Sequence, residues 1–377
     1  MHVHFAALDP VLEFALLAAL ALAAISLLVM AQVLLLSQLG ARRERRRARF
    51  EAQWRPLLVA ESLGLAPEHE LLPVPSKRRE SDWLLRLWNQ VQLHLRGPAH
   101  TRLNALLCVL GLDRHALSLL SRRDMRERLT GLSSLRHLGD SAYWGAIQPL
   151  LEAPGAAISL AAAEALVAID PVRAMRRVLP MAMRRRDWSR NRIELACLHA
   201  GAEAVTQPLV DLLREPLPGW ARARLLELLR HAEPRALAFW ARGILDRPLP
   251  AEAPLPGEHG DGDALARPGL ERIAAFRVLA AVRSPDDRRR ILAGLRDPLP
   301  EARLAAIEAL RPQIAAGDAD ALLRLLSDRA WAVRQAAADA LVAMPGLEPS
   351  ALAEMADAVY DRYGREALQR AIAERSP

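Results

Sequence analysis

Residues 295–310 read LRDPLPEARLAAIEAL, and residues 326–341 read LSDRAWAVRQAAADAL. At an offset of 31 residues the two stretches share a leucine at each end, an aspartate near the start, an arginine in the middle and alanines after it. Self-similarity at a fixed period is the sequence signature of a repeat architecture. The two stretches therefore predict two copies of one structural unit.

The same register continues toward the N-terminus. The last leucine of the unit has earlier counterparts at Leu279, Leu228, Cys197, Leu166 and Leu135. Every step is 31 residues except that from Leu228 to Leu279, which is 51 and so contains a 20-residue insertion. The first leucine has counterparts at Leu213, Ala182, Leu151 and Leu120, and the arginine recurs at Arg190 and Arg128. Ser159 and Ala221 replace the arginine in two units. We therefore predict seven repeats.

Each unit is predicted to contain two helices. An apolar stripe around Leu322 to Leu326 marks the first helix, and an Asp-containing turn follows it, which is typical of helix ends and N-caps. The second helix carries small residues beside large ones, which lets neighbouring helices approach closely. One such hairpin cannot bury its apolar face alone, but stacked hairpins can. The pattern therefore predicts an α-solenoid.

With a turn aspartate, a Val/Ala-Arg pair, Ala-Ala and Ala-Leu, the unit resembles the HEAT family. It is similar in particular to the short HEAT-like repeats first associated with phycobilin lyases, over residues 113–345. Among HEAT proteins, the chain resembles membrane-anchored bacterial ones. The resemblance implies a structural ladder of aspartates and arginines between neighbouring repeats, which we carry over only to Asp297, Arg303, Asp328 and Arg334. It also implies a binding function more than an enzymatic one.

Composition agrees with an all-α protein. Hydrophobic residues make up 52% of the 377 residues while aromatic residues make up only 4%, so Ala and Leu dominate the apolar content. Both are strong helix formers. The expected architecture is all-α: a solenoid of about seven HEAT-like two-helix repeats with a 31-residue period, preceded by one transmembrane helix.

The transmembrane helix is predicted at residues 11–37, within an almost unbroken apolar run. About 20 apolar residues span the hydrocarbon core as a helix. A cleaved signal peptide is the alternative, but residues 1–10 contain no Lys or Arg and the run exceeds a signal-peptide core. We expect residues 1–10 to form a short extracytoplasmic N-terminus.

A run of arginines follows the apolar segment: Arg42, Arg43, Arg45, Arg46, Arg47 and Arg49. With Glu44 it holds five of the chain's seven net positive charges, so the remainder is nearly neutral. Lys and Arg favour the cytoplasmic side of a membrane. We therefore expect a single-pass protein of the bacterial inner membrane, with the N-terminus outside and the HEAT domain in the cytoplasm. The six arginines are candidate contacts for anionic lipid headgroups.

The remaining segments are assigned from pattern. Residues 38–80 are predicted to hold the basic juxtamembrane segment, a short helix around Trp54 and a linker. Residues 81–112 are predicted to form an N-terminal capping helix pair and residues 346–377 the C-terminal capping helices, with a mobile insertion at about 249–268. Both cysteines, Cys108 and Cys197, are expected to be reduced core residues.

No catalytic chemistry is predicted. HEAT-like hydroxylases need several His-Glu pairs for iron, and this chain has one, His69-Glu70, before the array. Bilin lyases are soluble, and the pattern here contains no signal for a chromophore pocket. We find no phosphate-binding glycine loop, nucleophile elbow or metal-spaced His/Cys set. We therefore expect a non-enzyme with no cofactor, no metal and no small-molecule substrate.

One basic stretch stands out within the repeats. Its candidate partner-binding residues are Arg184, Arg185, Arg186, Trp188, Arg190 and Trp220. The alternative for the arginines is a solvated face of two consecutive helices. The alternative for the tryptophans, which lie at nearly equivalent places with Trp331, is packing as core residues at the turns. Trp and Arg are enriched where proteins bind one another.

The sequence thus favours a scaffold that holds a protein partner, itself membrane-associated, for example in an envelope or glycan-synthesis complex. Two alternatives stay open: a membrane-tethered nucleic-acid-binding module, as in HEAT-like DNA glycosylases, and a regulator that responds to anionic lipid. Nucleic acid is disfavoured because phosphate binding needs a broad basic field. The sequence does not identify the partner, the binding face or the oligomeric state.

Overall fold

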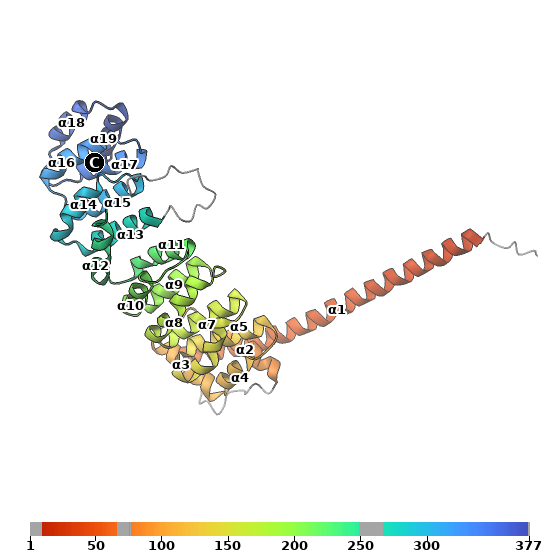
Figure 1. Cartoon of the computed structure of the whole chain (residues 1–377). Coiled ribbons are helices and arrows are strands. Elements are labelled where there is room, and N and C mark those ends of the chain that lie inside the picture. The colour runs from red at the N-terminus through yellow and green to blue at the C-terminus, as the bar shows by residue number, and fades with distance from the viewer. Residues whose placement is uncertain (1–9, 66–74, 76, 249–266, 376–377) are drawn as a thin grey trace, which may run out of the picture. The chain divides into compact units, whose positions relative to one another are not determined.

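A computed structural model describes residues 10–65, 75, 77–248 and 267–375. Throughout those residues the regular elements are helices, with no β-strand, which confirms the predicted all-α architecture (Figure 1). The chain divides into two compact units, Met1–Leu138 and Gly139–Pro377.

The first unit contains five helices among its described residues. They are α1 (Pro10–Leu63), α2 (Arg78–Gln92), α3 (Pro98–Val109), α4 (Leu112–Leu119) and α5 (Met125–Leu138). The α4 and α5 helices form the first hairpin of the 31-residue register. The α2 and α3 helices occupy the region in which we expected a capping pair.

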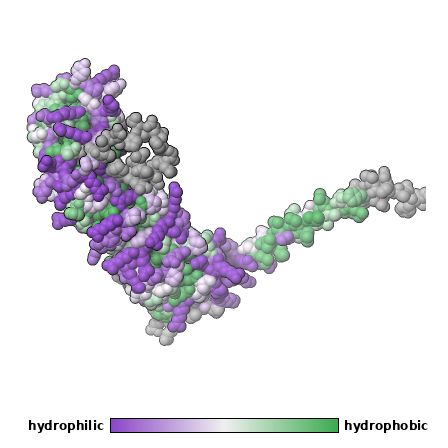
Figure 2. All heavy atoms as spheres, in the orientation of Figure 1, coloured by the Kyte–Doolittle hydropathy of each residue, from purple (hydrophilic) through white to green (hydrophobic). Residues whose placement is uncertain are grey.

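The apolar segment forms the first half of α1. Its large side chains stand free of the rest of the unit: Leu17, Leu22 and Leu27 are each at least 65% exposed. Figure 2 shows this apolar surface running along α1 until it meets the hydrophilic surface of the folded unit. By length and composition alone, the helix is a candidate membrane span.

The second half of α1 belongs to the core of the first unit. Trp54 and Leu58 are 2% and 1% exposed, and Arg102 of α3 donates hydrogen bonds to the carbonyl oxygens of Glu61 and Ser62 at the helix end. The short helix expected after the apolar segment is therefore not an element of its own but the second half of α1. The helix continues through Pro56 because packing against α2 and α3 compensates for the backbone hydrogen bond that proline cannot donate.

The second unit is a series of helical hairpins. Its described helices are α6 (Trp144–Ile147), α7 (Ala156–Ile169), α8 (Pro171–Arg184), α9 (Arg190–Ala200), α10 (Ala202–Leu213), α11 (Gly219–Leu228), α12 (Pro234–Leu245), α13 (Arg267–Val282), α14 (Arg288–Gly294), α15 (Pro300–Leu310), α16 (Ala319–Leu325), α17 (Trp331–Val342), α18 (Pro349–Ala358) and α19 (Arg362–Arg375). Short 3₁₀ turns precede α6, α14 and α16. Second helices of successive hairpins pack side by side, as α13, α15 and α17 do.

The periodic leucine positions are the core. The seven residues of the last-leucine register lie on α5, α7, α9, α11, α13, α15 and α17, and each is at most 1% exposed: Leu135, Leu166, Cys197, Leu228, Leu279, Leu310 and Leu341. The first-leucine register is likewise buried, from Leu120 to Leu326. Burying a leucine side chain is worth about 1.5–3 kcal/mol, so this register stabilises every hairpin.

Close helix approach depends on small residues. A Cβ atom at Gly294 on α14 would collide with the ring of Phe276 on α13 and with the Cβ atom of Ala306 on α15. The alanines at 305, 306 and 309 are also buried. Helices of adjacent hairpins can therefore approach closely at this point of the second unit.

Other expectations fall partly or wholly outside the described residues. The extracytoplasmic N-terminus, most of the linker with His69-Glu70, and nearly all of the insertion lie in residues 1–9, 66–74 and 249–266. The expectation for cysteine was half right. Cys197 is buried on α9, whereas Cys108 is exposed on α3 because its helix turns that face to solvent.

Candidate functional site

The candidate partner-binding residues lie between the end of α8 and the start of α11. The two ends are joined by an arginine that sequence analysis missed. Arg224 of α11 donates hydrogen bonds to the carbonyl oxygens of Ala182, Arg185 and Trp188, at 2.7, 3.0 and 3.1 Å. Burial lowers the pKa of its guanidinium group. Arg224 thus ties the turn after α8 to the next hairpin, and no motif marks it.

Arg185 has a similar structural part. Its guanidinium group donates to the carbonyl oxygens of Ala153 and Pro154 and to the carboxylate of Asp187. The hydrogen bond to Asp187 raises the pKa of Arg185 and lowers that of Asp187. Because its side chain is only 17% exposed, Arg185 secures the turns more than it faces solvent.

Trp188 is a core residue. It is 1% exposed, and its indole N–H donates to the Ser159 hydroxyl at 2.8 Å. Ser159 occupies the arginine position of its repeat, so the smaller side chain leaves room for the indole. This burial corrects the expectation that Trp188 contacts a partner directly. The alternative interpretation, a turn-packing tryptophan, describes it.

The remaining arginines differ in how far their charges are already paired. Arg190 is close to the carboxylates of Glu194 and Glu227, at 3.1 and 2.7 Å. Arg184 and Arg186 are exposed, and within the described part of the chain neither has a carboxylate partner. Arg184 and Arg186 thus retain charge for an external group, whereas Arg190 is largely neutralised.

Trp220 lines an open groove of about 800 Å³. We call it the Trp220 groove; its lining is Arg176, Pro180, Met183, Arg184, Pro208, Asp211, Leu212, Glu215, Pro216, Leu217, Pro218 and Trp220. The ring of Trp220 is half-buried, and the Arg224 guanidinium group lies 5.2 Å from its centroid. Arg186 is not part of the lining.

The groove combines rigid apolar and charged groups. Four prolines and an indole present surfaces that lose little conformational entropy on binding. Arg176 and Arg184 on one side and Asp211 and Glu215 on the other offer both signs of charge. Such a lining suits an extended peptide segment better than a small metabolite.

The predicted ladder has one complete rung between its own members. The Nε and Nη2 atoms of Arg303 bind both oxygens of the Asp328 carboxylate at 2.7 Å, and its Nη1 donates to the Asp297 carbonyl oxygen at 2.8 Å. Asp297 binds a residue that we did not assign, Arg272 of α13, at 2.6 Å. Arg272 is in register with Arg303, but the insertion before it hid the match. Bidentate, charge-assisted pairs of this kind fix geometry as well as adding energy.

Arg334 is the last member and departs from the ladder. Its Nη1 donates to the carbonyl oxygens of Asp328 and Arg329, and its guanidinium group lies 5.5 Å from the ring centroid of Tyr363. Val359 stands where the next aspartate would be. Arg365, one period after Arg334, donates to the Val359 carbonyl oxygen. The arginine register therefore extends into the pair expected to be a cap.

A second row of ion pairs links first helices. Arg242 of α12 binds Asp287 through two hydrogen bonds of 2.7 and 2.9 Å, and Arg288 of α14 binds Asp318. Asp287 and Asp318 are 31 residues apart and buried. Their periodicity was visible in the sequence, but the family pattern contains only the other row. Elsewhere Arg222, next to the interrupted position 221, binds Glu271.

The arginine run lies on α1 just beyond the apolar segment. Its members are exposed apart from Arg47, which donates to Glu51 at 2.6 Å. That contact raises the pKa of Arg47. In the described residues there is no group of three or more His, Cys, Asp or Glu side chains placed to hold a metal ion.

Comparison with known proteins bears on the repeats. Residues 289–373 match the family model of HEAT repeats, which covers α14 to α19 except the first residue of α14 and the last two of α19. A solved crystal structure of an engineered protein is similar at 13% identity, over 81% of this chain and 87% of that chain, with a TM-score of 0.31. No curated protein matches the chain. The match to HEAT repeats thus falls on the last three hairpins.

Proposed function

We propose that this protein is a membrane-anchored scaffold, with α1 spanning the membrane and the hairpins holding a protein partner at its cytoplasmic face. HEAT repeats generally mediate protein–protein interactions. The observation that carries the proposal is the Trp220 groove, in which Trp220 and four prolines lie beside two arginines that have no carboxylate partner among the described residues. Trp and Arg are the residue types that dominate binding energy at interfaces.

The lining also favours one kind of partner. An extended segment would place apolar side chains against Trp220 and Met183 and carboxylates near Arg176 and Arg184. Opposite charges across an interface accelerate association and exclude wrong partners. We therefore propose a partner with an exposed, acidic and apolar peptide segment.

The membrane part of the proposal rests on α1. Its apolar half is followed directly by the arginine run, which favours a cytoplasmic location for everything after residue 41. A bacterial inner membrane is the membrane that we propose, and the partner is proposed to be associated with it.

The test is site-specific photocrosslinking of full-length protein in intact membranes. A benzophenone amino acid replaces Pro216 in the groove, and a second chain carries it at Glu203, an exposed α10 residue outside the lining. We expect one discrete protein adduct from position 216 and none from position 203. Adducts of equal yield at both positions, or none at all, would contradict the proposal.

Charge variants sharpen this test. Arg176→Glu/Arg184→Glu alters the groove, while Arg177→Glu/Arg186→Glu makes the same charge change on exposed arginines outside it. We expect the first pair to reduce the adduct about tenfold and the second to leave it nearly unchanged, as for loss of one interface hot spot. If the protein instead carries nucleic acid that dissociates as salt rises, and both double variants carry less of it, a nucleic-acid-binding module becomes the better description.

A further inference from the structure

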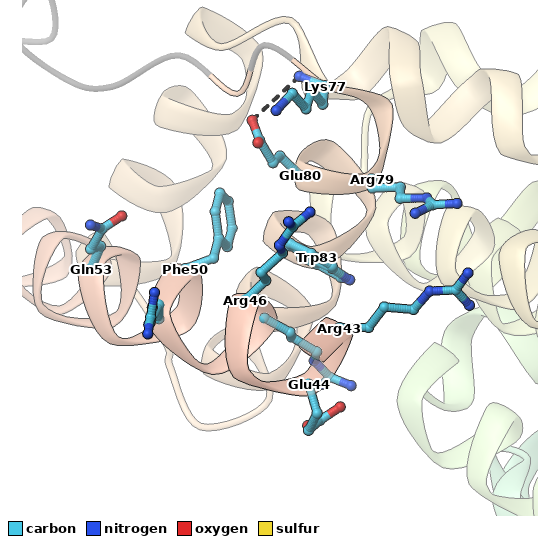
Figure 3. Close-up of a pocket in the computed structure, with 11 residues that line it drawn as sticks. Arg43, Glu44, Arg46, Phe50, Gln53, Lys77, Arg79, Glu80 and Trp83 are labelled. Carbon is cyan, nitrogen blue, oxygen red and sulfur yellow. Dashed lines mark hydrogen bonds between the residues drawn. The ribbon is translucent and has the colours of Figure 1, made fainter. Parts of the chain in front are cut away.

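A second concave site lies in the first unit, where α1 meets the start of α2. This α1–α2 pocket has a volume of about 790 Å³ and is lined by Arg43, Glu44, Arg46, Arg47, Arg49, Phe50, Gln53, Lys77, Arg79, Glu80 and Trp83 (Figure 3). Six of these side chains are cationic and two are acidic. The pocket therefore gathers positive charge from two segments that are more than twenty residues apart in the sequence.

Four of the arginines have uncommitted charges. Within the described residues Arg43, Arg46, Arg49 and Arg79 have no carboxylate partner, and all four line the pocket. Arg47, by contrast, is bound to Glu51, and Glu80 accepts a hydrogen bond from the Lys77 backbone N–H at 3.3 Å. Cations gathered around one concavity repel each other and raise the local concentration of anions. An anion in the pocket would relieve that repulsion.

Aromatic side chains form a supporting wall. The rings of Phe50 and Trp83 meet edge to face with centroids 5.8 Å apart, and Phe50 also lies 6.0 Å from Trp54. Trp54 is buried, so the wall is anchored in the core of the unit. Figure 3 shows Phe50 on α1 and Trp83 on α2 among the charged side chains that line the pocket. The wall thereby holds the α1 cations in a fixed position beside Lys77 and Arg79 at the start of α2.

The pocket begins where the apolar segment ends. At 1.5 Å per residue, Arg43 lies about 6 Å and Gln53 about 21 Å along α1 from Leu39. The polar layer on each side of a bilayer is about 5–8 Å thick. If α1 spans the membrane as proposed above, the mouth of the pocket lies at the depth of lipid phosphates and its interior faces the water beyond.

We propose that the α1–α2 pocket binds a phosphate-bearing anionic group. The planar guanidinium groups of Arg43, Arg46 and Arg79 match phosphate oxygens, and Lys77 adds a point charge. An anionic lipid headgroup and a soluble phosphate share this chemistry. The first source rests on the proposed membrane span, whereas the pocket itself does not.

The arginine run supplies a matched control. Lys77→Gln/Arg79→Gln removes two charges from the pocket, and Arg42→Gln/Arg45→Gln removes two charges from the run without touching the lining. A diffuse electrostatic contact with lipid predicts equal effects, or a larger one for Arg42 and Arg45. A pocket predicts that the α2 pair dominates, although it lies outside the run.

Full-length protein is placed in nanodiscs of phosphatidylcholine with or without phosphatidylglycerol. Retained phosphatidylglycerol is measured by native mass spectrometry, and inorganic phosphate is titrated into the neutral nanodiscs by calorimetry. We expect saturable binding that weakens about tenfold in Lys77→Gln/Arg79→Gln and less than about twofold in Arg42→Gln/Arg45→Gln. Retention of phosphatidylglycerol alone assigns the site to lipid, and binding of inorganic phosphate as well assigns it to free phosphate.

Equal losses in the two variants, or no saturable binding of either probe, would overturn the proposal. The photocrosslinked adduct at position 216 is measured in the same variants, so that failure of the phosphate-binding proposal can be distinguished from failure of the scaffold proposal. An intact adduct without phosphate binding leaves the scaffold standing and removes the pocket. A missing adduct with phosphate binding does the reverse.

Discussion

Asp297 and Asp339 show how burial decides the strength of an ion pair. Asp297 is fully buried and accepts from Arg272, whose side chain is only 12% exposed. Asp339 and Arg370 form a similar pair at 3.3 Å, but both side chains are more than 40% exposed. Removing Asp297 strands a buried guanidinium group, whereas removing Asp339 frees a solvated one.

We therefore expect Asp297→Ala to lower the free energy of unfolding by about 3 kcal/mol and Asp339→Ala by less than about 0.5 kcal/mol. Urea unfolding followed by circular dichroism measures both. Equal losses would show that the ladder adds no more than a surface contact does.

We expect His137 to make the first unit sensitive to acid. Burial is the main cause that lowers its pKa from 6.5 to about 4, and nearby Arg136 and His100 act in the same direction. Its ring packs edge to face on Trp88 at 5.7 Å. Between these two pKa values the unfolded chain binds the proton and the folded chain does not, so stability present above pH 6.5 falls as pH drops toward 4.

We expect His137→Phe, which keeps an aromatic ring, to reduce this loss between pH 7 and 5 (about the range in which unperturbed histidine titrates). Trp fluorescence during urea unfolding reports the midpoint. Exposed His199 on α9, changed to Gln, is the control, and its pH profile should follow that of the wild type. A wild-type midpoint that stays level across this range would remove His137 as the cause.

Single residues also show what a sequence pattern can and cannot predict. The register identified Leu310 and its counterparts as core because period and hydrophobicity are both local properties of the chain. Arg272 was missed because an insertion displaced its neighbours, and Arg224 because its three carbonyl acceptors come from a different hairpin. Trp188 and Trp331 look alike in sequence, yet they are 1% and 68% exposed. Their burial depends on which side chain the adjacent repeat supplies, such as Ser159.

At the scale of elements, α1 does two jobs that the sequence assigned to separate segments. Its apolar half is exposed, while Trp54 and Leu58 in its other half are core residues of the first unit. Hydropathy predicts the first part well. It does not predict that the helix continues past the arginine run, because the burial of two side chains over α2 and α3 is a tertiary effect.

A truncation pair tests this division. A chain that begins at residue 41 keeps Trp54 and Leu58, and we expect it to be monomeric in size-exclusion chromatography. A chain that begins at residue 66 uncovers the faces of α2 and α3 that these side chains cover, so we expect it to aggregate. Losing one buried Trp costs about 3–5 kcal/mol, which is comparable with the stability of a small domain. Monodisperse behaviour of the shorter chain would show that α2 and α3 suffice as a cap.

At the scale of the whole molecule, the proposed topology can be read from the two natural cysteines. Cys108 is exposed on α3, whereas Cys197 is buried and its burial raises its thiol pKa to about 12. Because the thiolate is the reactive form, a maleimide should label Cys108 far faster than Cys197. If residues after 41 are cytoplasmic, a membrane-impermeant maleimide should leave Cys108 unlabelled in intact cells and label it once the membrane is permeabilised.

An added cysteine completes the topology measurement. Ala7→Cys in a Cys108→Ser chain places a thiol before the apolar segment, so we expect this thiol to be labelled in intact cells without permeabilisation. Labelling of Cys108 in intact cells would show the opposite orientation. The Trp220 groove would then lie outside the cytoplasm, and the arginine run would lie on the side that Lys and Arg normally avoid. Equal labelling of Cys108 in the natural chain and of the added thiol in the variant, both recovered in soluble extract, would mean that α1 does not anchor the chain. The scaffold would then act away from the membrane.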